Sequence, residues 1–93
     1  MVVGTLVLDL HIGGSASLKD RRRVVKSIKD RIRARFNVCV ADVGEQDRWQ
    51  SARLGIAVVA GDSAFAHEVL SKVGDLVNAD ARVEIVSREI RVA

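Results

Sequence analysis

Hydrophobic and polar residues alternate along much of the chain with the two-residue period of β-strands that bury one face. Between Leu6 and Ile12 every second residue is leucine or isoleucine. The segment 54–60 is almost entirely apolar, which favours a strand in the interior of a sheet. The pattern predicts four strands, at residues 5–12, 36–43, 54–60 and 82–92.

The last predicted strand does not keep one phase, because its apolar positions change face between Ile85 and Ile90. Successive side chains of a strand point to opposite faces, so one extra residue is enough to restore the buried face. We therefore expect a β-bulge near Val86 and Ser87.

Two other segments show the spacing of amphipathic helices. The first runs from about 18 to 35 and follows Ser17, which with Asp20 three residues later resembles a capping box. The second follows the turn and N-cap residues at 61–63. Its apolar arc consists of Ala66, Val69, Leu70, Val73, Leu76 and Val77.

The order strand, helix, strand, strand, helix, strand consists of two similar halves. Residues 6–16, LVLDLHIGGSA, align without gaps onto residues 54–64, LGIAVVAGDSA. Two β-α-β halves that bury both helices on one side form a ferredoxin-like sandwich. We predict a single α+β domain over residues 1–93, a four-stranded antiparallel sheet in strand order 4-1-3-2 with two helices on one face.

Composition adds that the chain is an ordinary globular protein, with 48% hydrophobic and 29% charged residues. The apolar opening is far shorter than the ~20 residues of a membrane span and has no basic leader. Cys39 is the single cysteine, and with His11 and His67 it makes no metal-ligand spacing. We expect a cytoplasmic, non-enzymatic protein with no membrane contact, cofactor, metal or catalytic residues.

The charge is distributed unevenly along the chain. Residues 17–36 contain nine of the fifteen Lys and Arg residues but two of the twelve acidic residues, so this segment carries +7 and the remainder −4. A one-sided basic surface suits nucleic acid, whereas a solvated helix face is the commoner explanation of such a run. Six of the cations form a continuous flank on a helical wheel: Lys19, Arg22, Arg23, Lys26, Lys29 and Arg33.

Two arginines at the start of the first helix depart from the apolar pattern of the second half. Extended into the helices, the alignment of the halves places Arg21 and Arg22 opposite Val69 and Leu70. Arg21 points toward the sheet, where a guanidinium needs an anion or carbonyl oxygens as partners.

The predicted topology brings the loops at 13–17 and 44–50 to one end of the sheet. Asp42 or Asp47 could pair there with Arg21 or Arg22. The alternative is an external anion, held at the helix N-terminus by the loop backbone together with Lys19 and Arg21. Trp49, in the same polar loop, either covers the end of the core or offers a contact surface.

Several of these residues resemble the YlxP-like bacterial family over essentially the whole chain: Ser17-Leu18-Lys19-Asp20 with Arg21-Arg22, Phe36-Asn37-Val38, Ala41, and Gln46-Asp47 with Trp49-Gln50. The resemblance implies a ferredoxin-like fold and a bacterial, cytoplasmic setting, since members of this family are commonly encoded near ribosome-binding factor A and translation initiation factor 2. It implies no established activity. It also supports a candidate site at the sheet end: Ser17, Arg21, Gln46, Asp47, Trp49 and Gln50.

Two main functional hypotheses follow. The first is an RNA-binding or ribosome-associated module that uses the basic flank on phosphates. The second is a homodimer or protein-interaction module that uses the open face of the sheet, where apolar residues are expected to be exposed. That face would present Val7, Cys39, Ala41, Val43, Ala57 and Val59.

Overall fold

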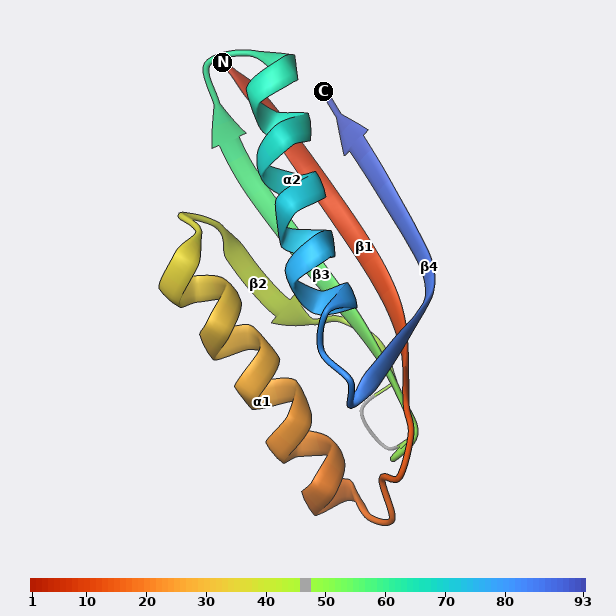
Figure 1. The fold of residues 1–93 in the computed structure, drawn as a ribbon. Helices are drawn as coiled ribbons and strands as arrows, with labels where there is room; N and C mark the ends of the chain where they lie inside the picture. The colour runs from red at the N-terminus through yellow and green to blue at the C-terminus, as the bar shows by residue number, and fades with distance from the viewer. Residues whose placement is uncertain (46–47) are drawn as a thin grey trace.

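The computed structural model describes residues 1–45 and 48–93 of the chain. It has a four-stranded antiparallel sheet with two helices packed on one face (Figure 1). The strand order is β2-β3-β1-β4, which is the predicted order counted from the other edge. The elements are β1 (Val2–Ile12), α1 (Leu18–Arg35), β2 (Cys39–Asp42), β3 (Ser51–Ala60), α2 (Ser63–Asn78) and β4 (Val83–Val92).

The two central strands are longer than the apolar pattern predicts. β1 begins at Val2 and β3 at Ser51, three residues earlier than predicted in each case. They pair without interruption from Val2 opposite Ala60 to His11 opposite Ser51. Backbone hydrogen bonds to a neighbouring strand satisfy polar groups whatever the side chains are, so pairing extends both strands beyond their apolar runs.

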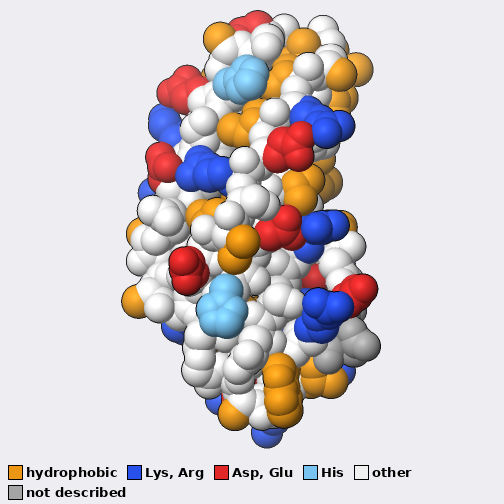
Figure 2. All heavy atoms as spheres, turned by 90° about the vertical axis from the view of Figure 1, so that its right-hand side faces the viewer, with side chains coloured by type: hydrophobic (Ala, Val, Ile, Leu, Met, Phe, Trp, Pro, Cys, Tyr) orange, Lys and Arg blue, Asp and Glu red, His pale blue; other side chains and the backbone are white. Residues whose placement is uncertain are grey.

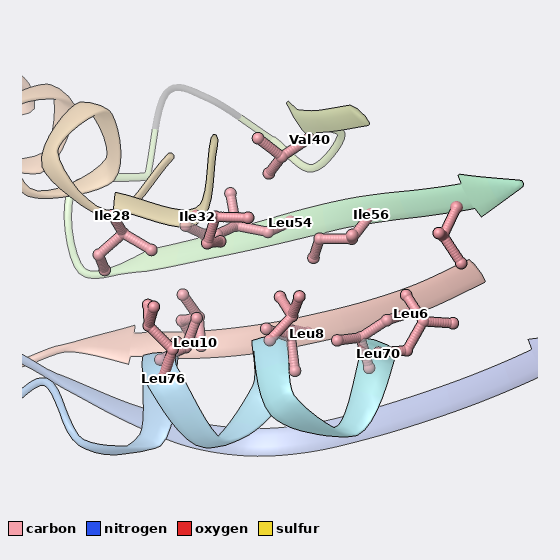
Figure 3. Packing of buried hydrophobic residues seen from close by; sticks show 14 of the residues in the cluster. Leu6, Leu8, Leu10, Ile28, Ile32, Val40, Leu54, Ile56, Leu70 and Leu76 are labelled. Atoms are coloured by element: carbon pink, nitrogen blue, oxygen red, sulfur yellow. The ribbon is translucent and has the colours of Figure 1, made fainter. Parts of the chain in front are cut away.

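The core lies between the sheet and the two helices (Figure 3). Leu6, Leu8 and Leu10 point inward from β1, and each is at most 2% exposed. Ile28 and Ile32 of α1 pack against the same layer. Since leucine and isoleucine each stabilise by roughly 1.5–3 kcal/mol when fully buried, this layer is the main force that holds the helices to the sheet.

The β-bulge expected in the last strand is present. β1 pairs with β4 in a register that shifts between Asp9 and Leu10, so that Val86 has no partner. Ile85 and Ile90, on either side of the shift, both pack against the core, whereas Val86 is 68% exposed. The change of apolar phase in the sequence is therefore absorbed by one extra residue.

The internal repeat ends with the strands and does not continue into the helices. Five residues connect β1 to α1, whereas two connect β3 to α2. Counted from the N-caps, Arg21 corresponds to Ala66 and Arg22 to the exposed His67. The predicted correspondence with Val69 and Leu70 is wrong, and α1 has replaced one buried apolar position with arginine, not two.

Candidate functional site

The loops that follow β1 and β2 lie together at one end of the sheet, which we call the rim (Figure 1). The backbone N–H of Ile12 donates to the carbonyl of Gln50 at 2.9 Å and joins the two loops directly. This juxtaposition confirms what the topology predicted. Two of the candidate residues in the second loop, Gln46 and Asp47, lie outside the described residues.

The start of α1 has the predicted Ser17 cap, and the reciprocal contact of Asp20 goes to Ala16, one residue before the N-cap. The Ser17 Oγ accepts from the backbone N–H of Asp20 at 3.1 Å, and the Asp20 carboxylate accepts from the N–H of Ala16 at 3.2 Å. The preceding turn uses Gly14 with a φ of +76°, a left-handed conformation that favours glycine. These contacts occupy groups that an anion at this helix end would otherwise bind.

Arg21 is fully committed to internal partners. It is 1% exposed, and its Nε donates to the Ser51 carbonyl at 2.9 Å. Its two terminal nitrogens donate to the two carboxylate oxygens of Asp42 at 2.8 and 3.3 Å. Of the partners that the sequence left open, Asp42 contacts Arg21, and Asp47 lies outside the described residues. The bidentate pair ties the first turn of α1 to β2 and β3, so Arg21 is not available to an external anion.

Most of the basic flank faces a groove between α1 and β2. The groove has a volume of about 450 Å³ and includes Asp30 and Asp42 on its walls. Arg33 crosses to the outer edge of β2 and donates to the Val40 carbonyl at 3.0 Å, which covers a backbone acceptor of this edge strand. Lys19 and Arg23 are exposed outside the groove. The flank residues that line it are Arg22, Lys26, Lys29 and Arg33.

Positive charge on the flank exceeds the negative charge next to it. Lys26 contacts Asp30 at 2.7 Å, and the hydrogen bond from this lysine lowers the pKa of Asp30. Arg33 lies 3.9 Å from the same carboxylate. In the described part of the chain Arg22 and Lys29 have no carboxylate partner. The flank therefore keeps a net positive charge that is accessible to solvent.

The side of the molecule formed by β4 is different, because Lys and Arg side chains there are interspersed with Asp and Glu (Figure 2). Arg91 contacts Glu89 at 2.8 Å, and Arg88 contacts Asp75 at 3.5 Å. On the open face nearby, Arg53 contacts Asp9 at 2.7 Å. On these surfaces the arginines contact nearby carboxylates, so positive and negative charge are balanced there. The flank differs because its positive charge is not balanced in this way.

A second buried carboxylate, Asp80, joins α1 to the turn between α2 and β4. It is 6% exposed and accepts from Arg82 and, at 3.2 Å, from Arg31. The hydrogen bonds from Arg82 hold the pKa of Asp80 at about 2. The sequence analysis did not single out this residue. The only local sign of this contact is the sequence Asp80-Ala81-Arg82, because the other partner, Arg31, lies 49 positions away.

Trp49 is half exposed at the rim and does not cover the end of the core. Its exposed fraction is 51%, and it is absent from the buried hydrophobic cluster. Together with His11, Arg48, Gln50 and Ser51 it lines an open hollow of about 620 Å³. Of the two roles that the sequence left open for this ring, a contact surface is the one that the geometry favours.

The open face of the sheet carries a shallow apolar groove of about 430 Å³ between β1, β3 and β2. Val43 is 56% exposed and lies over Gly55, whose missing side chain leaves room for it. Cys39 is a free, exposed thiol on the same face. The residues that the sequence placed on this face line the groove, apart from Val59: Val7, Cys39, Ala41, Val43 and Ala57.

Within residues 1–45 and 48–93, no group of three or more His, Cys, Asp and Glu side chains is arranged to hold a metal ion. Among these same residues, no helix is long and apolar enough to cross a membrane. His11 and His67 are both exposed and lie on different elements.

Comparison with known proteins identifies the family. A family model described as "Protein of unknown function (DUF503)" matches residues 3–90. The chain belongs to this family. The uncharacterized protein YlxP of Bacillus subtilis (strain 168) is 30% identical over 83 residues, which are 89% of this chain and 90% of YlxP. The resemblance inferred from the motifs is confirmed, and the DUF503 name assigns no activity.

Solved structures show the fold of this DUF503 member. The de novo designed protein LFR1, described as having a ferredoxin fold, superimposes with a TM-score of 0.60 at 16% identity and covers 98% of this chain and 86% of its own. The designed protein Foldit4 gives a TM-score of 0.55, also at 16% identity, over 99% and 94% of the two chains. These similarities confirm the ferredoxin-like architecture.

The candidate residues of this DUF503 chain divide by what they contact. Ser17 caps α1, and the Gln50 carbonyl joins the two rim loops. Arg21 is buried against Asp42, so its function is structural. Trp49 faces solvent, and the basic flank forms a separate surface along α1. At the rim, the Arg21–Asp42 pair and the hydrogen bond between the two loops are internal contacts, whereas Trp49 is exposed.

Proposed function

We propose that this protein is a non-enzymatic RNA-binding module that holds the phosphate backbone along the basic flank of α1. The observation that carries the proposal is the row of flank cations beside the groove, where Arg22 and Lys29 have no carboxylate partner among the described residues. Cations without internal partners are the groups that can exchange bound counterions for phosphates. A ribosomal or translation-linked RNA is the class that the family resemblance favours.

The flank supports affinity more than sequence recognition. Lys and Arg contacts to phosphates position a nucleic acid but do not read bases. The described residues of the open sheet face include no Phe, Tyr or Trp along the strands, so a platform like that of an RRM is not part of this proposal. We therefore expect salt-sensitive binding with little sequence preference.

Neutralising the flank is expected to weaken RNA binding and to reduce its dependence on salt. Each phosphate contact to a single strand contributes a slope of about −0.7 in log affinity against log salt. Replacing Arg22, Lys26 and Lys29 by glutamine should therefore reduce the magnitude of the slope by about 2. Fluorescence anisotropy of labelled ribosomal RNA fragments, titrated from about 50 to about 200 mM salt, measures both quantities.

The matched control removes the same charge from surfaces outside the flank. Arg35, Lys72 and Arg91 are all exposed, and their replacement by glutamine changes the net charge equally. If the two triple variants lose the same affinity, binding follows net charge alone and the flank is not the site. Absence of RNA binding by the wild-type chain at the lowest salt would overturn the proposed function as a whole.

The apolar groove on the open face favours a second candidate, a homodimer. A face with exposed Val43 and Val59, at 56% and 65% exposure, loses unfavourable contact with water when a second copy covers it. Light scattering over a dilution series is expected to show a mass of two chains at high concentration, and Val43→Asp is expected to reduce it to one chain. A wild-type mass of one chain at every concentration would contradict this candidate.

A further inference from the structure

A large aromatic ring in a polar loop normally gains stability by burial, and Trp49 does not. The indole is 51% exposed and packs outside the core cluster, so its apolar area stays in contact with water. A half-exposed tryptophan at the edge of a hollow is typical of a contact surface, because it combines a flat apolar face with an N–H donor. This surface belongs to neither the basic flank nor the apolar groove.

The groups around the ring suit a nucleobase. His11 is exposed at the end of β1 and lines the same hollow, which adds an imidazole ring to the indole. Arg48 contacts the Glu45 carboxylate through its Nε at 2.6 Å, and its guanidinium remains exposed, so that its flat face can stack on a base. Gln50 and Ser51 supply polar groups beside them. A planar heteroaromatic ring with hydrogen-bonding edges and an anionic linkage matches this combination.

Hydrogen bonds hold the backbone at Gln50 and Ser51, which follow Trp49. The carbonyl of Gln50 accepts from Ile12, and that of Ser51 accepts from the buried guanidinium of Arg21. His11 and Ser51 are directly paired residues of β1 and β3. Trp49 therefore directly precedes a segment fixed by the sheet and by the buried ion pair. The ordered backbone next to Trp49 reduces the conformational entropy that the loop loses when a ligand stacks on the ring.

The buried Arg21 connects the hollow to the groove of the basic flank. It lines the groove and donates to the carbonyl of Ser51, one of the residues that line the hollow. The next residue, Arg22, is the first of the groove cations. A single strand whose phosphates follow α1 toward its N-terminus approaches the rim. A base that is not paired in a duplex can stack there, whereas a paired base is inaccessible.

We propose that Trp49, with His11 and Arg48, is a stacking site for an unpaired base of single-stranded RNA. The proposal rests on the RNA binding proposed above and adds the form of RNA and the residues that select it. Stacking on an aromatic side chain contributes affinity for every base, since each base has a π-face. The flank thus provides general attraction, and the hollow favours single strands over duplexes.

Tryptophan fluorescence tests this site directly, because Trp49 is the only tryptophan in the chain. We expect an unlabelled single-stranded oligouridine or oligoadenine to quench the emission, and a duplex of the two to leave it largely unchanged. Anisotropy of the same RNAs, labelled, reports binding independently. Trp49→Ala is expected to weaken single-strand binding roughly 10-fold or more and duplex binding hardly at all, while Trp49→Phe keeps most of the affinity.

Phe65 offers a matched control, since it is an aromatic residue of similar exposure, 53%, at the start of α2 on the opposite end of the molecule. Phe65→Ala should bind single strands like the wild type. Equal quenching by single strand and duplex, or unchanged single-strand affinity of Trp49→Ala, would overturn the stacking site and leave flank binding intact. Absence of any binding in the anisotropy titration would instead overturn the proposed function, and the stacking site with it.

Discussion

Replacing Arg21 by methionine is expected to lower the free energy of unfolding by about 3–5 kcal/mol. The substitution leaves the carboxylate of Asp42, whose side chain is 11% exposed, without the guanidinium that contacts both of its oxygens. It also removes the donor to the Ser51 carbonyl. Removing one partner of a buried pair costs the full desolvation of the remaining charge. Urea denaturation at neutral pH measures the change.

The adjacent residue provides the control for this prediction. Arg22 is exposed, and Arg22→Met should change the free energy of unfolding by at most about 0.5 kcal/mol. The double variant Arg21→Met with Asp42→Leu should recover part of the loss, because it removes both charges. Arg21→Lys should remain destabilised, since one ammonium group cannot reproduce the bidentate contact. Equal stability of the Arg21 and Arg22 variants would show that the buried pair contributes nothing.

Acidification is expected to destabilise the fold through Asp80. Its pKa is about 2 in the folded protein, against 3.8 for an ordinary aspartate, so the folded state favours the charged form. The resulting stabilisation is fully present at a pH above 3.8, the ordinary pKa of aspartate. It is lost as the pH falls through the pKa of about 2 in the folded protein. At 1.36 kcal/mol per pKa unit, this residue contributes about 2 kcal/mol at neutral pH. Urea denaturation between neutral pH and pH of about 2 measures the loss.

The comparison of Asp80→Asn with Asp30→Asn isolates this contribution. Asp30 is an exposed carboxylate that also lies beside cations. The Asp30→Asn variant keeps Asp80 and therefore keeps the contribution of Asp80 to the pH dependence of stability. Asp80→Asn should be about 2 kcal/mol less stable than the wild type at neutral pH and should show a correspondingly flatter dependence on acid. If wild type and Asp80→Asn lose stability in parallel as the pH falls, the low pKa is not the source of the stabilisation.

The fold follows closely from the hydrophobic pattern. The alternation in β1 and the apolar run in β3 predicted the two central strands, and the change of phase in β4 predicted the bulge at Val86. Each of these features depends on which side of a strand or helix is buried. The designed ferredoxin-fold proteins, at 16% identity, reach the same architecture with different residues. This agreement is expected where burial pattern, not residue identity, specifies the fold.

The helix starts agree with the predicted caps, but the correspondence between the two helices was less predictable, because it depends on loop length. An ungapped repeat carries no information about the three extra residues between β1 and α1. The N-cap contacts of Ser17 and Asp62 set the helical phase independently in the two halves. A position-by-position comparison of the helices therefore placed Arg22 on a buried arc when it is exposed.

The sequence by itself determined the strand order, the basic flank and the meeting of two loops at the rim. These features follow from the periodicity of apolar residues and from the order of the elements, and both can be read from the sequence without knowing the tertiary contacts. Only the tertiary structure decided that Arg21 pairs with Asp42, that Asp80 meets Arg31 from 49 positions away, and that Trp49 stays exposed. Those outcomes depend on distances of a few ångströms between side chains from different elements. Such distances are set by how the elements pack, and no local pattern of residues contains them.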